Sequence, residues 1–309
     1  MNLRLPQDSP RTKAYIFFLI VAIIWGIAGP VIKFTLGGFS PLVFLVYRFA
    51  ISTVVALVIF TVSRIRIPKN PSLFWLAILY SFLSSTVGLA ILFYGYENTS
   101  VLYATLISAI APILVAVGGV IFLKEHLTSR EKVGIGIASA GTVVSILGPS
   151  LNGNGDGNIL GNLLVLLSLF VGVATAVMGK NLLRDDVSAM FLTNLSFIVG
   201  FVTLLPVLLF TTSFPEIVNQ LVNTRLSFHL GVIYMALFSG TLAYYLWHKA
   251  QKTIEIGEGG LFAYLYPLFS TPLAVFWLKE KITTPFIIGA IIIALGVFIA
   301  EYKKQRITS

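Results

Sequence analysis

The sequence is dominated by apolar runs, each about as long as a lipid bilayer is thick. A helix needs roughly 20 apolar residues to cross the hydrocarbon core. The runs reach that length without the short alternating segments of a membrane β-barrel, so they predict an all-α polytopic membrane protein with ten transmembrane helices. The expected spans are 14–36, 41–63, 73–96, 101–123, 130–148, 158–180, 190–212, 227–249, 258–279 and 284–302.

Composition favours the same class and excludes several others. Apolar residues make up 57% and charged residues 11% of the 309 residues, and the mean hydropathy is +0.94. Soluble domains carry about 25% charged residues, so this chain lacks the polar surface that water requires. The sequence holds no cysteine, which excludes disulfides, thiol nucleophiles and thiolate metal sites.

Part of the sequence occurs twice, at a constant shift of 155 residues. Each copy predicts a helix that contains a proline, a charged Lys-Glu edge and a second helix, with structural or gating roles for the prolines and glutamates. The two repeats are expected to be 1–148 and 158–309, joined by an Asn- and Gly-rich linker at 149–157. The matching positions are Pro112, Lys124, Glu125, Thr128, Gly134 and Gly141 with Pro267, Lys279, Glu280, Thr283, Gly289 and Gly296, and Ser84 and Thr86 with Ser239 and Thr241.

Basic residues are divided unevenly between the two sets of loops. With the N-terminus in the cytoplasm, 16 of the 21 Lys and Arg residues lie on the cytoplasmic side, as the positive-inside rule requires. We therefore expect a plasma-membrane protein with both termini in the cytoplasm. Because five spans is an odd number, the second half enters from the opposite face. Inverted repeats of this kind are typical of alternating-access carriers, although a duplicated scaffold without transport is the alternative.

Several short motifs resemble one family of membrane proteins. Trp25-Gly26 and Lys33 in the first span, Arg48-Phe49 in the second, and the repeated proline, Lys-Glu and glycine positions are similar to the EamA-like branch of the drug/metabolite transporter superfamily. The resemblance covers nearly the whole chain. It implies a five-plus-five arrangement of ten spans and a carrier, in most members an exporter of amino acids or other small metabolites. Relatives that carry nucleotide sugars or triose phosphates leave the cargo open.

Two basic residues lie within the expected spans. Lys33 follows Gly29-Pro30, which should loosen the first span, so its ammonium either reaches the outer headgroups or faces a cavity and binds an anion. Arg48 lies roughly 10 Å deep at 1.5 Å per residue and is expected to donate to carbonyls of neighbouring helices. Since the spans hold no carboxylate at comparable depth, an anion from substrate or solvent is another candidate partner for one of them.

Polar and aromatic residues near the span centres are candidates for a binding cavity between the halves. Small hydroxyl residues also stabilise ordinary helix packing, whereas aromatic residues away from the headgroup region are less easily explained. An aromatic, weakly charged cavity suits a small amphipathic solute. We expect Lys33 and three aromatic residues to face one cavity. The candidate substrate-binding residues are Trp25, Lys33, Ser85, Ser108, Thr175, Ser239, Tyr245 and Tyr264.

The titratable residues bear on how transport could be coupled. All twelve carboxylates fall at span ends or in loops, and His229 and His248 lie at the two ends of the eighth span. Proton-driven carriers often use an acidic residue buried in mid-span, which is absent here. The pattern favours an uncoupled carrier or an exchanger, with a proton site at a membrane edge as the alternative.

The sequence also bears on functional classes other than transport. A membrane enzyme would need a motif such as HExxH, paired aspartates or GxSxG, and the sequence contains none, so we expect no enzymatic activity, cofactor or metal site. A translocase for a lipid or lipid-linked sugar, and an exchanger for nucleotide sugars or phosphorylated metabolites, remain alternatives to a metabolite exporter. Expected partners are a small-molecule substrate and membrane lipids, not nucleic acid, and the chain is either a monomer or a homodimer.

Overall fold

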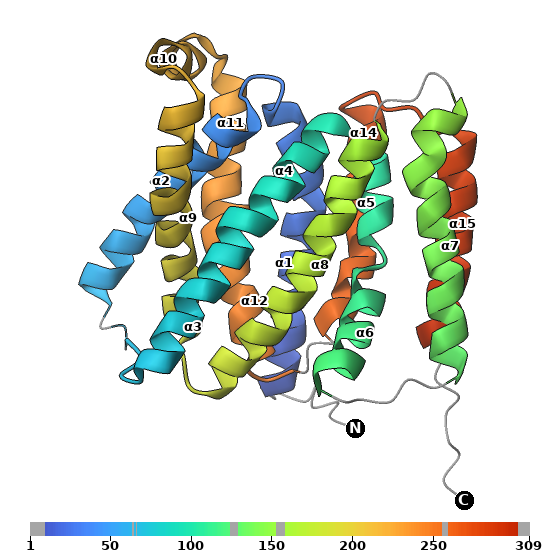
Figure 1. The fold of residues 1–309 in the computed structure, drawn as a ribbon, viewed down its shortest axis with the longest axis horizontal. Helices are drawn as coiled ribbons and strands as arrows, with labels where there is room; N and C mark the ends of the chain where they lie inside the picture. Colours follow the sequence, from blue (N-terminus) through green and yellow to red (C-terminus); the bar gives the residue numbers. More distant parts are fainter. Residues whose placement is uncertain are drawn as a thin grey trace, which may run out of the picture.

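The computed structural model describes residues 10–63, 65, 67–123, 129–152, 158–254 and 259–301, and their regular secondary structure is helical without strands (Figure 1). The first half contains α1 (Pro10–Thr35), α2 (Pro41–Val62), α3 (Pro71–Ser81), η1 (Phe82–Gly88), α4 (Leu89–Asn98), α5 (Val101–Ser108), α6 (Ala111–Leu123) and α7 (Ser129–Asn152). The second contains α8 (Ile159–Arg184), α9 (Ala189–Thr211), α10 (Phe214–Asn223), α11 (Leu226–Ala236), η2 (Leu237–Leu242), α12 (Ala243–Gln251), η3 (Leu261–Leu265), α14 (Tyr266–Phe276) and α15 (Thr284–Glu301).

Six of the expected spans are long and apolar enough by themselves to cross a membrane. Shorter apolar helices occupy the four other expected ranges, at Val101–Val115, Lys132–Gly148, Leu261–Phe276 and Thr284–Ile299. Helix α7 continues to Asn152, four residues into the expected linker. The six long helices are Pro10–Thr35, Pro41–Val62, Pro71–Asn98, Ile159–Arg184, Ala189–Thr211 and Leu226–Gln251.

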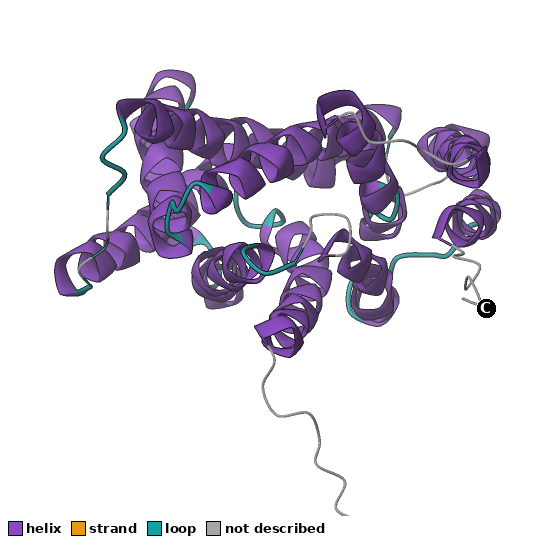
Figure 2. Cartoon of the chain, turned by 90° about the horizontal axis from the view of Figure 1, so that it is seen from below, coloured by secondary structure: helices purple, strands orange, loops and turns teal. Residues whose placement is uncertain are grey.

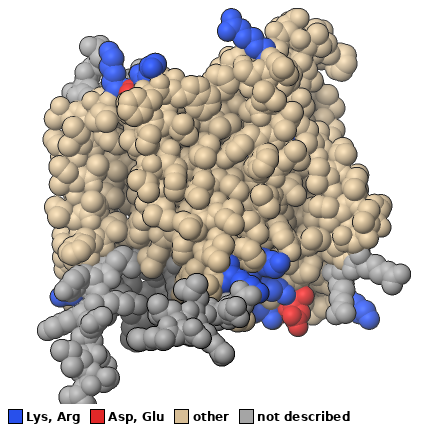
Figure 3. Space-filling view, turned by 180° about the vertical axis from the view of Figure 1, so that it is seen from behind, with Lys and Arg blue, Asp and Glu red and all other residues tan. Residues whose placement is uncertain are grey.

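The outer surface between the two ends of the bundle is apolar. Large hydrophobic side chains point outward along it, and Phe210 is 91% exposed. On the face shown in Figure 3, the described Lys, Arg, Asp and Glu side chains gather at the two ends and leave a band without charge between them. Such a band matches the hydrocarbon core of a bilayer, so the chain is an integral multi-pass membrane protein.

The two expected proline-containing spans are not continuous helices. Helix α5 ends at Ser108 and α6 begins at Ala111, while the 3₁₀ turn η3 gives way to α14 at Tyr266. Pro112 and Pro267 therefore lie in the first turns of new helices. Proline lacks the N–H that would bond to the preceding turn, and its ring clashes with that turn, so the first turn of a helix is its favoured position. The expectation of one unbroken helix in each copy is wrong. Proline does not always break a helix, because Pro30 lies inside α1, which continues to Thr35, and the expected loosening of the first span at Gly29-Pro30 does not interrupt it.

Two long helices contain a π-helical turn at matching positions. In the first half η1 separates α3 from α4, and in the second half η2 separates α11 from α12. The two turns begin at Phe82 and Leu237, which differ by the same 155 residues as the sequence repeat. Turns of this type widen the helix by one residue and are frequent at functional sites. They carry the repeated serines and threonines of the sequence.

Helices α7 and α15 lie side by side at one edge of the bundle, with opposite directions (Figure 1). Their backbones approach closely at the repeated glycines. A Cβ atom added at Gly296 would lie 2.7 Å from the carbonyl oxygen of Gly134, and one added at Gly289 would lie 3.3 Å from that of Gly141. Glycines at these positions let two membrane helices pack without intervening side chains.

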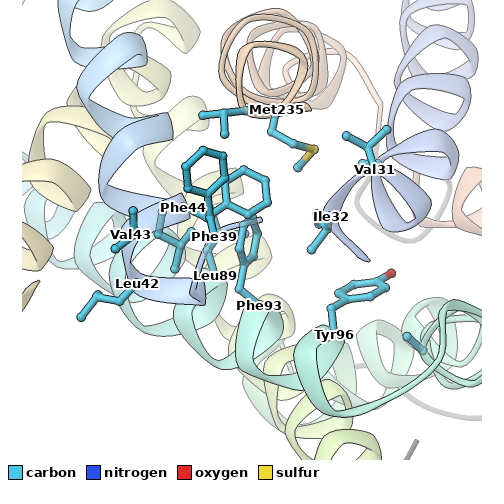
Figure 4. Packing of buried hydrophobic residues seen from close by; sticks show 14 of the residues in the cluster. Val31, Ile32, Phe39, Leu42, Val43, Phe44, Leu89, Phe93, Tyr96 and Met235 are labelled. Carbon is cyan, nitrogen blue, oxygen red and sulfur yellow. The ribbon is translucent and has the colours of Figure 1, made fainter. Parts of the chain in front are cut away.

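The main core joins the first two helices to α4 and α11. Phe44 of α2 and Phe93 of α4 pack edge to face with ring centroids 4.9 Å apart, and Met235 of α11 lies above them (Figure 4). Seen from below, the helices stand in two rows (Figure 2). The core contains residues from both halves of the chain, such as Phe44 and Met235. Arg48 follows this aromatic group one turn later on α2.

Candidate functional site

The most unusual buried side chain is that of Arg48. It is 1% exposed, and its Cζ atom lies 5.8 Å from the ring centroids of both Phe49 and Phe93. The main chain of η2 lies against its other side, since a Cβ atom added at Gly240 would be 3.5 Å from Nη2. Among the described residues, no atom accepts a hydrogen bond from Nε or Nη1. The guanidinium thus lies against rings and backbone, and two of its three nitrogens have no hydrogen-bond acceptor among the described residues.

This arrangement corrects the expectation for Arg48. We expected a donor to carbonyls of neighbouring helices, and those hydrogen bonds are absent from the described part of the chain. A buried donor without an acceptor is unfavourable, and a buried charge without a partner is more so. A structural role through hydrogen bonding does not account for an arginine here.

Trp25 of α1 is the centre of a second group, which we call the aromatic cluster: Trp25, Tyr244, Trp247 and Tyr266. The indole Nε1 donates to the carbonyl oxygen of Ser239 at 3.0 Å. Its ring lies 5.1 Å from Tyr244, 5.3 Å from Trp247 and 6.4 Å from Tyr266, measured between centroids. The cluster joins α1, α12 and α14, which belong to different halves of the chain.

The aromatic cluster and Arg48 meet at the same π-helical turn. Trp25 binds the carbonyl of Ser239, and the Arg48 guanidinium lies against the next residue, Gly240. Phe197 of α9 connects the two groups, because a Cβ added at Gly240 would be 3.5 Å from its ring and the ring centroid lies 6.0 Å from that of Tyr244. A cation and a set of aromatic faces therefore stand next to each other in the bundle.

One of the expected aromatic residues, Tyr245, is not among the rings in contact with Trp25. It packs against the buried cluster that contains Ala77 and against the one that contains Val21, and the Lys249 ammonium lies 5.3 Å from its ring centroid. Consecutive residues on a helix point about 100° apart, so Tyr244 faces Trp25 and Tyr245 does not. Tyr264 lies in η3, and the ring of Tyr266, two residues later, is in contact with Trp25. Tyr244 and Trp247 were missed from the sequence, although their three-residue spacing places them on one face of a helix.

The expected small polar residues divide into two kinds. The hydroxyls of Ser108 and Thr175 donate to carbonyls one turn back in their own helices, which is ordinary behaviour in membrane helices. Ser85 and Ser239 are buried on η1 and η2. Only Ser239 is tied to the aromatic cluster, and it contributes its backbone carbonyl rather than its hydroxyl.

Lys33 interacts with the end of a helix. Its ammonium donates to the carbonyl oxygens of Tyr96 at 2.9 Å and Glu97 at 3.1 Å, in the last turn of α4. Carbonyls were not among the partners expected for Lys33, which were the outer headgroups or an anion, but a helix C-terminus offers free carbonyls and a negative partial charge. Lys180 of α8 makes similar contacts at the end of α12, where it donates to the carbonyls of Gln251 and Ile254.

The repeated glutamates and one histidine also take structural positions. Glu280 accepts hydrogen bonds from the backbone N–H groups of Val101 at 2.7 Å and Leu102 at 2.9 Å, and so caps the start of α5. Glu125 lies outside the described residues. His248, expected at the membrane interface, is buried; its two ring nitrogens are 2.8 Å from the Tyr80 hydroxyl and 2.7 Å from the Thr193 hydroxyl.

The arrangement provides binding groups rather than reactive ones. Within the described ranges, no three His, Asp or Glu side chains come together as metal ligands. Arg48 can hold an anionic group, and the aromatic cluster can hold a flat or apolar one. These features define an integral membrane protein with a polar and aromatic site between its helices.

The comparisons with known proteins give the family. The chain belongs to the EamA-like transporter family, whose model matches residues 12–147 and 159–302. A protein of Archaeoglobus fulgidus named an uncharacterized transporter is 28% identical over 94% of this chain and all of its own. One of Escherichia coli K12, named a probable amino-acid metabolite efflux pump, is 24% identical over 93% of this chain and 94% of its own. A solved crystal structure shares the fold with a TM-score of 0.65 at 19% identity, over 94% of this chain and 96% of that one.

Proposed function

We propose that this protein is a secondary transporter that moves a small amphipathic metabolite, such as an amino acid, out of the cell. In this proposal it lies in the plasma membrane with both termini in the cytoplasm and works by alternating access between two inverted five-helix repeats. Membership of a transporter family supports the general function. The name of the Escherichia coli relative supports export and the amino-acid class.

The packing of α7 against α15 carries the inverted-repeat part of the proposal. A two-fold operation that exchanges the repeats takes Gly134 to Gly289 and Gly141 to Gly296. The close approach of Gly296 to Gly134 then becomes an approach of Gly141 to Gly289, and both approaches are present. Because α7 and α15 run in opposite directions (Figure 1), the operation turns one repeat upside down relative to the other.

The two lysine contacts agree with the same symmetry. Tyr96, whose carbonyl accepts from Lys33, and Gln251, whose carbonyl accepts from Lys180, are also 155 residues apart. Each lysine comes from the first long helix of its half. An inverted repeat places such equivalent contacts at opposite membrane faces. An alternating-access carrier has to close its substrate pathway at each of these faces in turn.

The breaks in the helices supply places where the repeats could bend. The changes from α5 to α6 and from η3 to α14 interrupt two helices, and η1 and η2 interrupt two more. Hinges are usually a few residues at the ends of elements that absorb the change in backbone angles. In the proposed cycle each repeat bends at these positions, while the same residues continue to line the site between the repeats.

Transport by purified protein in proteoliposomes tests the proposal. Radiolabelled amino acids, nucleosides and sugar phosphates are offered with and without a pH gradient, and protein-free vesicles give the background. Saturable movement of an amino acid or related solute is expected. Trp25→Ala should slow transport of a cargo that stacks on the aromatic cluster, whereas Trp75→Ala, at a tryptophan 66% exposed on the outside of α3, should not. Saturable movement of sugar phosphates alone would contradict the proposed substrate class.

A further inference from the structure

We infer that Arg48 binds the carboxylate group of the transported solute, and that this solute carries one carboxylate and an apolar or aromatic body. The inference rests on the proposed function, because it treats the ligand of this site as the cargo. It assigns to Arg48 a role in recognition and gives the cargo a chemical class more specific than a small metabolite.

The described residues supply no counter-ion for Arg48. Its side chain is 1% exposed, and Nε and Nη1 have no acceptor in the described residues. The carboxylates of the sequence all lie at span ends or in loops. Glu280, the one described carboxylate that is buried, accepts backbone hydrogen bonds at the start of α5. A guanidinium in this position needs an anion that comes from outside the chain.

Two carbonyls at η2 are bonded to neutral donors instead of to Arg48. The carbonyl of Ala236, just before η2, accepts from the Ser52 hydroxyl at 3.1 Å, and that of Ser239 accepts from the Trp25 indole at 3.0 Å. These two carbonyls at η2 thus accept from neutral donors, while Nε and Nη1 of Arg48 have no acceptor among the described residues. This distribution is unfavourable for a structural arginine and suits one that receives a ligand.

The number of positive charges available at the site limits the charge of the cargo. One guanidinium presents donors in a planar fork that matches a carboxylate. A phosphate dianion would need further cations, but the ammonium groups of Lys33 and Lys180 are bonded to helix ends. No mid-span carboxylate is available to pair with a substrate ammonium. Arg48 therefore recognises the carboxylate, and an amino group on the cargo is not required.

The aromatic cluster lies next to Arg48, at the same π-helical turn. The Arg48 guanidinium and the Trp25 indole lie against consecutive residues of η2, and Tyr244 contacts Trp25 on one side and Phe197 on the other. A solute that places its carboxylate at Arg48 has aromatic faces within reach of its apolar part. Together these groups select a short molecule with one charged end.

Ligand binding by the purified protein tests this inference without relying on transport. Thermal unfolding is followed with three compounds that share a phenylethyl body: phenylpyruvate, phenylalanine and phenethylamine. Phenylpyruvate and phenylalanine should raise the unfolding temperature in a saturable way, and phenethylamine, which lacks the carboxylate, should not. Equal stabilisation by phenethylamine, no stabilisation by either carboxylate, or a shift of the same size with chloride alone would overturn the inference.

Variants of Arg48 add a readout that a structural arginine would not give. Arg48→Gln should weaken phenylpyruvate binding by about 10- to 100-fold, the range for a lost charged hydrogen bond, and Arg48→Lys should keep part of the binding. Because the Gln variant buries no unpaired charge, its unliganded form should unfold at the same temperature as the parent or higher. Arg225→Gln, at an exposed arginine before α11, is the matched control and should bind normally.

The outcomes separate this inference from the proposed function. An Arg48→Gln protein that unfolds earlier but binds phenylpyruvate normally would show a structural arginine and overturn the inference. If the Gln variant does not fold, the three-compound series on the parent protein still decides. Carboxylate binding that depends on Arg48 without transport in proteoliposomes would leave the site standing and contradict the transporter. Transport of solutes irrespective of a carboxylate group would support the transporter and contradict the role of Arg48.

Discussion

The packing of α7 against α15 makes a specific prediction for Gly296→Ala. An added Cβ would lie nearest to the backbone nitrogen of Ala138 and 2.7 Å from the carbonyl oxygen of Gly134, whereas ordinary contact begins at 3.4 Å, so the two backbones must separate locally by more than about 0.7 Å. Both atoms sit on helical backbone and cannot turn away as a flexible side chain would. Overpacking of this kind typically destabilises a protein by about 1–3 kcal/mol.

A matched control is present on α7 itself. Gly136 is exposed, and a Cβ added there meets no atom within 4 Å. Because alanine is the better helix former by about 1 kcal/mol, Gly136→Ala should be neutral or stabilising. The same chemical change should therefore have opposite signs at two glycines of one helix pair.

Thermal unfolding of the purified variants in one detergent measures the difference. Gly296→Ala should lower the unfolding temperature by about 2 to 6 °C, using the usual relation between free energy and unfolding temperature. Gly136→Ala should leave it unchanged or raise it. If Gly296→Ala unfolds at the parent's temperature or above, the close approach of the two helices, and the symmetry argument built on it, would be refuted.

Three further predictions follow from other contacts. Single cysteines placed at exposed Lys69 and exposed Arg225 of this cysteine-free chain should react with a membrane-impermeant maleimide from opposite sides of the membrane. Because Lys69 is expected on the cytoplasmic side and Arg225 outside, only the cysteine at 225 should label in intact cells, and equal labelling would contradict the topology. Glu280→Gln should lower the unfolding temperature because it removes a charged cap, whereas the same change at exposed Glu216 should have little effect. Lys180→Met should also lower the unfolding temperature, since the carbonyls at the end of α12 lose their donor; normal thermal stability of this variant would argue against the cap.

The sequence by itself determined the class of the protein and much of its helical organisation. Apolar runs of bilayer length predict helices because every backbone polar group in lipid must be satisfied within its own segment. The constant shift of 155 residues also predicted which segments would match, and the starts of the two π-helical turns have that shift. These properties depend on local composition and spacing, which a linear sequence displays directly.

Only the tertiary structure decided which side chains meet. Lys33 binds carbonyls 63 and 64 residues away, and Trp25 binds one 214 residues away, so neither partner could be chosen from local sequence. Tyr244 and Tyr245 have the same side chain and adjacent positions, yet the 100° turn between them places only one in ring contact with Trp25. Arg48 is the clearest case. Its place in the sequence allowed either a carbonyl or an anion as partner, and the choice between them depends on which acceptors of the folded helices are bonded to other donors.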